Sequence, residues 1–107
     1  MANGDKKLGR NSASVEVAGT GASLPVICGF KPDKVEIYNR TRNSMAVWTS
    51  QMPEASAQKM VDSGAGTTDI SFVTVNGITP TFNGFNLGTD TDLNQAADVI
   101  YCVAFKH

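Results

Sequence analysis

Short runs of alternating apolar and polar residues constrain this 107-residue chain more than any other feature. Val15 and Val17 alternate with polar residues, residues 34–40 do the same, and residues 99–105 are apolar on both alternating faces. A period of two is typical of β-strands, and a strand that is apolar on both faces is usually central in a sheet. Turn residues recur every 8–12 residues or so, which is typical of a β-sandwich or barrel. We therefore expect an all-β fold, a small β-sandwich or barrel of about seven short antiparallel strands.

Glycine, proline and asparagine set the expected strand ends. Residues 34–40 and 45–49, joined by a polar connection, predict a hairpin. Pro25 marks its run as an edge strand or a strand start, because proline cannot donate to a ladder. The dipeptides Asn76-Gly77 and Asn83-Gly84 favour positive φ and predict two tight turns between short strands.

Residues 51–62 break the alternation. Pro53 followed by Glu54 could open one helical turn, and a loop fits equally well. We expect Met52 and Met60 to hold this segment on the core. Beyond it, residues 63–66 predict a turn because two of the four are glycine.

The length, charge and hydropathy of the chain argue against several classes of protein. The chain fits one domain over residues 13–107, preceded by a flexible basic arm over residues 1–12 that carries too little apolar surface to order alone. A net charge of −1 argues against a nucleic-acid partner, and no apolar run is long enough to span a membrane. The polar N-terminus shows no secretory signal.

Catalytic motifs are missing from the sequence. The one histidine is the terminal His107, and no Gly-rich phosphate loop or nucleophile elbow occurs, so we expect no enzyme and no cofactor. Cys28 and Cys102 lie among apolar residues and are expected to be buried free thiols.

Two clusters are weaker candidates for a site. Asp90, Asp92 and Asn94 copy the first half of a calcium loop, but Gln95 and Tyr101 stand where the second half needs Gly and Glu, so a structural turn is favoured and no metal is expected. Tyr38, Arg42 and Trp48 flank the predicted hairpin. They could form a surface for a glycan or another partner, and core packing with an exposed turn explains them as well.

Residues 29–39, Trp48-Thr49 and the stretch 84–94, closed by Val103-Ala104-Phe105, resemble small virion structural proteins of tailed bacteriophages. The resemblance covers residues 26–105. Members with assigned roles decorate the capsid or belong to tail appendages, so the resemblance implies a β-rich virion component. The acidic loop matches the family pattern, which we interpret as a constraint on the fold.

Together these observations predict a capsid decoration (cement) protein located on the capsid surface of a virion assembled in the host cytoplasm. We expect Lys6, Lys7, Leu8 and Arg10 of the arm to contact the major capsid protein. The expected partners are that protein and further copies of the chain, for which a homotrimer is one arrangement, with neither nucleic acid nor membrane. The alternatives are a carbohydrate-binding module of a tail fibre or host-recognition appendage, and a neck or connector component.

Overall fold

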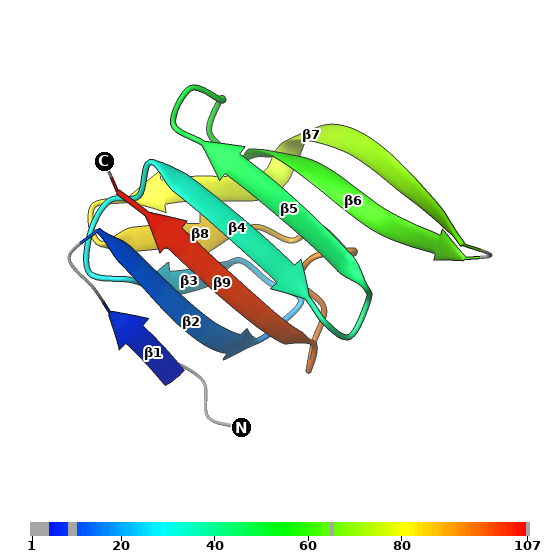
Figure 1. Cartoon of the computed structure of the whole chain (residues 1–107), viewed down its shortest axis with the longest axis horizontal. Helices are drawn as coiled ribbons and strands as arrows, with labels where there is room; N and C mark the ends of the chain where they lie inside the picture. The colour runs from blue at the N-terminus through cyan, green and yellow to red at the C-terminus, as the bar shows by residue number, and fades with distance from the viewer. Residues whose placement is uncertain (1–4, 9–10, 65, 107) are drawn as a thin grey trace.

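The computed structural model describes residues 5–8, 11–64 and 66–106 of the chain. Within them, nine antiparallel strands form one sheet in the order β1-β2-β9-β4-β5-β6-β7-β8-β3. The fold is therefore all-β, and the sheet curls into a nearly closed barrel, as the strand pattern predicted (Figure 1). The strands are β1 (Asp5–Leu8), β2 (Ser12–Ala18), β3 (Leu24–Ile27), β4 (Lys34–Asn39), β5 (Ser44–Thr49), β6 (Ser56–Gly64), β7 (Thr67–Thr81), β8 (Gly84–Leu87) and β9 (Val99–Phe105).

The sheet folds over so that two layers enclose the core. Strands β2, β9, β4 and β5 form the front layer in Figure 1, and β8, β3 and the second half of β7 lie behind them. Every second residue of the front strands is buried, which explains the period of two in the sequence. The core contains Ile37, Trp48, Phe85 and Ile100, and Leu93 of the loop 88–98 also packs in it. Burial of these side chains is the main term that stabilises the barrel.

Several strand boundaries agree with the sequence. The hairpin β4–β5 pairs Lys34 with Thr49 and Asn39 with Ser44, and β9 lies centrally between β2 and β4. Pro25 lies in β3, which is an edge strand at one end of the sheet order. Gly84 begins β8 after the expected turn. A Cβ there would lie 1.9 Å from the Val26 carbonyl oxygen, so this close approach of β8 to β3 requires glycine.

Two expectations about the middle of the chain are wrong. Residues 56–64 form strand β6 rather than a loop or helical turn, and Met60 lies on the outer side of β6 opposite Met45, whereas Met52 does pack on the core. Asn76-Gly77 does not end a strand. Asn76 has the expected positive φ, of 60°, but it lies in a bulge, where β7 leaves β6 and joins β8.

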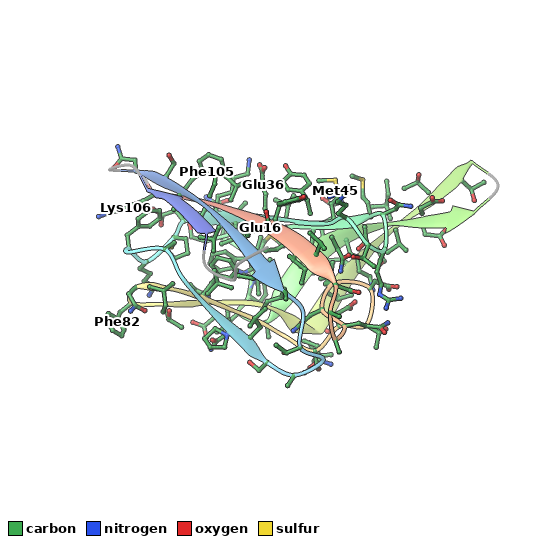
Figure 2. The ribbon with its side chains drawn as sticks, turned by 90° about the horizontal axis from the view of Figure 1, so that it is seen from below. Glu16, Glu36, Met45, Phe82, Phe105 and Lys106 are labelled. Atoms are coloured by element: carbon green, nitrogen blue, oxygen red, sulfur yellow. The ribbon has the colours of Figure 1, made fainter. Side chains whose placement is uncertain are left out.

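The hairpin β6–β7 projects from the barrel, as both views show (Figures 1 and 2). Beyond Val61, β6 has no partner in β5, so the outer part of the hairpin is a two-stranded ribbon. Both faces of such a ribbon meet solvent, and its sequence therefore shows no single apolar face. We call the strand pair formed by Gln58–Gly64 and Thr67–Val73 the projecting hairpin.

The backbone of residues 5–8 forms edge strand β1, which pairs with β2 from Asp5↔Glu16 to Leu8↔Ala13. The side chains of Lys6, Lys7, Leu8 and Arg10 lie outside the described residues, as does His107. Their expected contacts with a capsid therefore stay a prediction.

Candidate functional site

A row of large side chains crosses the outer face of the front layer. Cross-strand register places Tyr101 of β9, Tyr38 of β4, Met45 of β5, Met60 of β6 and Ile70 of β7 beside one another. We call these five residues the outer row. Neighbouring strands lie about 4.8 Å apart, so the row is about 19 Å long. Tyr38 and Ile70 are exposed, with exposed fractions of 37% and 62%, and the other three are half-buried.

A second row runs parallel to the outer row on the same face. It consists of Val103, Glu36, Val47, Gln58 and Phe72. Phe72 is 54% exposed. Figure 2 shows Glu36, Met45 and Phe105 together on this side of the ribbon, whereas Phe82 lies at the opposite side of the molecule. The outer face thus combines apolar and aromatic side chains with a few polar groups, which is the usual composition of a protein–protein interface.

Polar neighbours hold both tyrosines of the outer row. The Tyr38 hydroxyl donates to the Glu36 carboxylate, which is 3.2 Å from the Lys34 ammonium, and Arg40 donates to the Tyr101 hydroxyl at 3.4 Å. The hydrogen bond from Tyr38 is the main cause that lowers the pKa of Glu36, although partial burial opposes it, and the same bond raises the pKa of Tyr38. Side chains fixed in this way lose less entropy when a partner binds.

One end of the outer face carries an unpaired acceptor. Glu16 of β2 pairs in register with Tyr101, and its Oε2 is the one buried side-chain atom in the described part of the chain without a hydrogen-bond partner. A buried carboxylate oxygen without a partner is costly, and a donor from a bound partner would relieve that cost.

The acidic loop forms a structural turn built around a lysine. The Lys59 ammonium lies 2.7 Å from Asp92 Oδ2 and 3.0 Å from Asp90 Oδ2, and the Asp90 carboxylate also accepts the Asp92 backbone N–H. Burial disfavours the charged ammonium, but the hydrogen bonds to Asp92 and Asp90 outweigh it and raise the pKa of Lys59. Asn94 bonds to the backbone of Thr20, Ala22 and Gly88 instead. The Lys59 ammonium thus occupies the position that a metal ion would take between the two carboxylates. Among the residues that the structure describes, no three His, Cys, Asp or Glu side chains are grouped so that they could hold a metal ion.

Asp98 anchors the other end of this loop, and the sequence did not single it out. Its Oδ2 accepts hydrogen bonds from Asn39 Nδ2 at 2.9 Å, Arg42 Nε at 3.0 Å and the Gln95 backbone N–H at 3.2 Å. Burial by itself would raise the pKa of Asp98, yet these three donors lower it below its ordinary value of 3.8. Asn39 also donates to the Leu93 carbonyl, so the network fixes the loop across the open end of the barrel. The sequence feature that could have pointed to Asp98 is the position of an aspartate directly before a buried strand.

The structure does not bring Tyr38, Arg42 and Trp48 together. Trp48 is 2% exposed, on the core side of β5, and its indole N–H donates to the Pro53 carbonyl at 3.0 Å. Tyr38 lies on the opposite face of the sheet, and Arg42 pairs with Asp98. These three residues therefore do not form a shared glycan or partner surface. The alternative, core packing, holds for Trp48, because Val35 and Trp48 are register partners whose side chains both enter the core.

The cysteines behave as the sequence predicted. Cys28 and Cys102 are both buried thiols, and the Cys28 thiol donates to the Phe30 carbonyl at 3.3 Å. Burial is the main cause that raises the pKa of Cys102 to about 12, and the nearby Cys28 raises it further. The Cys102 thiol is therefore protonated and unreactive at neutral pH.

An open groove of about 700 Å³ lies at one end of the front layer. Asp33, Lys34 and Phe105 contribute to its walls, with the Lys34 ammonium 5.8 Å from the centre of the Phe105 ring. The groove adjoins the outer face. We therefore treat it as part of the same surface.

Comparisons with protein-family models, curated proteins and solved structures find no match. No helix in the described part of the chain has the length and apolarity needed to cross a membrane.

Proposed function

We propose that this protein is a virion structural protein that acts by surface complementarity, as a decoration (cement) protein bound to the outside of a capsid. The observation that carries the proposal is the outer row, an apolar and aromatic surface that no further layer covers among the residues that the structure describes. The capsid as partner comes from the resemblance of the sequence to virion components of tailed bacteriophages.

The composition of the outer face suits a rigid protein partner. Tyrosine and methionine are enriched at interfaces, and tyrosines in particular supply much of the binding energy when they lie near the centre of the contact. Tyr38 and Tyr101 are neighbours at one end of the outer row, and Lys34, Glu36 and Arg40 provide polar groups around them. A cement protein needs this combination because it stabilises a shell by adding interface area across subunit boundaries.

The alternatives receive less support from the geometry. The sequence offered Tyr38, Arg42 and Trp48 as the surface of a glycan module, and these three side chains do not meet because Trp48 is in the core. A neck or connector component would form rings. The number of copies bound per capsid shell, measured in the experiment below, distinguishes it from a decoration protein.

The test measures occupancy on purified capsid shells of the same virus. We expect Tyr38→Ala to weaken binding by about 30-fold, the effect of losing roughly 2 kcal/mol at an interface hot spot. The matched control is Phe82→Ala, because Phe82 is an exposed aromatic residue on the other side of the molecule (Figure 2). It should bind like the unchanged protein. Equal binding of all three proteins, or no saturable binding at all, would contradict the proposal.

The N-terminal arm is tested separately. Deleting residues 1–10 removes Lys6, Lys7, Leu8 and Arg10 and leaves β2, which begins at Ser12. If the arm contacts the capsid as we propose, the truncated protein should show lower occupancy while its urea midpoint stays close to that of the full chain. Unchanged occupancy would remove the arm from the proposal and leave the outer row.

A further inference from the structure

Strand β7 leaves one of its backbone edges open. Its first half pairs with β6 from Thr67 to Val73, and only Ile78–Thr81 pair with β8 on the other side. Along residues 68–75, therefore, the described part of the chain provides no strand on the side opposite β6. Alternate backbone N–H and C=O groups of this segment point outward, as at any edge strand.

The other edges of the sheet are protected in the usual ways. Strand β3 has four residues and contains Pro25, and strand β1 has four residues and contains Lys6 and Lys7 in its sequence. Short length, proline and lysine all prevent an edge from pairing with another strand. Residues 68–75 contain no proline and no lysine, and their one charged residue is Asp69. The chain thus protects two edges and leaves the third available.

The open edge also carries large apolar side chains. Ile70, Phe72 and Val75 are exposed by 62%, 54% and 65%. The segment is rich in β-branched and aromatic residues, which favour strand pairing. An edge of this kind in a natural protein is expected to be covered by another strand.

We propose that two copies of this chain pair through their β7 edges, antiparallel about a two-fold axis at Ser71, to form a dimer with one continuous sheet. This register sets Ile70 of each copy opposite Phe72 of the other on the outer face. Pairs of an aromatic and a β-branched residue are among the favourable cross-strand pairs. Since the contact is symmetric, it occurs twice in the dimer.

The charge on the edge supports this arrangement. In the antiparallel register Asp69 faces Val73 of the other copy, and the two Asp69 side chains are about 14 Å apart along the strands. This exceeds the screening length of about 8 Å at physiological salt, so their repulsion is weak. A parallel in-register pair would instead set the two carboxylates side by side.

The geometry also fixes the number of copies. An antiparallel contact between identical edges is isologous, so each copy uses its own β7 edge and leaves none free. The assembly therefore ends at two copies rather than three. It joins the outer row of each copy, through Ile70, to the second row of the other copy, through Phe72, and this doubles the apolar surface on one side of the dimer. The inference stands whether or not the partner of the outer row is a capsid.

Sedimentation equilibrium of the full chain over a concentration series tests the dimer. We expect a monomer–dimer equilibrium that Phe72→Lys weakens by at least about 30-fold, since the new ammonium faces Ile70 twice. Phe82→Lys is the matched control and should leave the equilibrium unchanged, because it adds the same charge at an exposed aromatic position outside the pairing segment 68–75. Circular dichroism and urea unfolding check that both variants fold.

Cysteine cross-linking tests the register. At the proposed axis, Ser71→Cys brings two thiols within disulfide range, and oxidised glutathione should link them. Thr74→Cys lies on the same edge but would be about 20 Å from its counterpart, so it should not link. A monomer at all concentrations, a trimer or larger species, a dimer indifferent to Phe72→Lys, or linkage at position 74 rather than 71 would each overturn the inference.

Discussion

Replacing Asp98 by asparagine should destabilise the barrel more than any surface substitution. Asp98 is 2% exposed, and one oxygen, Oδ2, accepts three hydrogen bonds, from Asn39, Arg42 and the Gln95 backbone. The substitution keeps the size of the side chain and removes the charge. The Arg42 guanidinium loses its ion-pair partner, and two neutral donors lose a charged acceptor.

These contacts determine how much the substitution should lower the free energy of unfolding. Breaking a buried ion pair by removing one partner costs about 3–5 kcal/mol. Arg42 is 38% exposed, so water can solvate it in the variant, and Asn39 keeps its bond to the Leu93 carbonyl. We therefore expect the lower value, about 3 kcal/mol at pH 7. For a chain of 107 residues this corresponds to a fall in Tm of about 13 °C.

Urea unfolding followed by tryptophan fluorescence measures this loss, because the single tryptophan, Trp48, is buried in the core. The matched control is Asp69→Asn, which makes the same chemical change at an exposed position of β7 and should alter the free energy of unfolding by less than about 0.5 kcal/mol.

The pH dependence provides a second check. The folded-state pKa of Asp98 is lowered, so its contribution is fully present above the ordinary value of 3.8 and is lost as the pH falls through the lower folded value. The difference in free energy of unfolding between the unchanged protein and Asp98→Asn should be constant near neutral pH and shrink below about pH 4. Equal urea midpoints at pH 7, or a difference that does not change down to pH 2, would refute this account of the network.

Three further substitutions or reactions test other contacts. Lys59→Ala leaves the carboxylates of Asp90 and Asp92 without their cation and should cost about 1–2 kcal/mol in urea unfolding, with the smaller loss at high salt. Gly84→Ala places a methyl group in the path of the neighbouring β3 backbone and should lower the free energy of unfolding by at least about 2 kcal/mol, as measured by thermal denaturation. The raised pKa of Cys102, about 12 against 9.0, implies about a thousandfold less thiolate, so alkylation by iodoacetamide at pH 8 should occur only when the protein unfolds.

The parts of the fold that the sequence predicted are those in which local pattern and burial agree. The β4–β5 hairpin has a buried face and a polar turn, so its period of two is visible, and β9 shows its central place through the apolar run from Val99 to Phe105. Pro25 indicated an edge strand because its missing N–H is tolerated only there. These signals depend on neighbouring residues and need no knowledge of the partners of each strand.

Strand β6 escaped prediction because it does not have one buried face. Gln58, Lys59 and Asp62 interrupt the apolar residues of β6, and the strand is specified by pairing with β7 rather than by a core. Asn76-Gly77 was a misleading turn signal. Its positive φ is real, but it serves a bulge within β7, and a dipeptide alone does not distinguish a bulge from a hairpin turn.

Neither the outer row nor the Asp98 network could be found from the sequence, since both depend on register between distant strands. Tyr38 and Tyr101 are 63 positions apart in the chain and become neighbours only when β4 pairs with β9. Asn39, Arg42 and Asp98 meet for the same reason. A shift of one residue in the β4–β9 register would turn one of the two tyrosines inward and break both features at once.

The sequence nevertheless contained a sign of the binding surface, in the strand that is apolar on both faces. Such a strand is expected to be covered on both sides. In β9 the core covers Ile100, Cys102 and Ala104, whereas Tyr101 and Val103 face outward and are half-buried, with no further layer of the described chain above them. The apolar pattern of β9 is thus explained if a bound protein covers its second face, as we propose for the outer row.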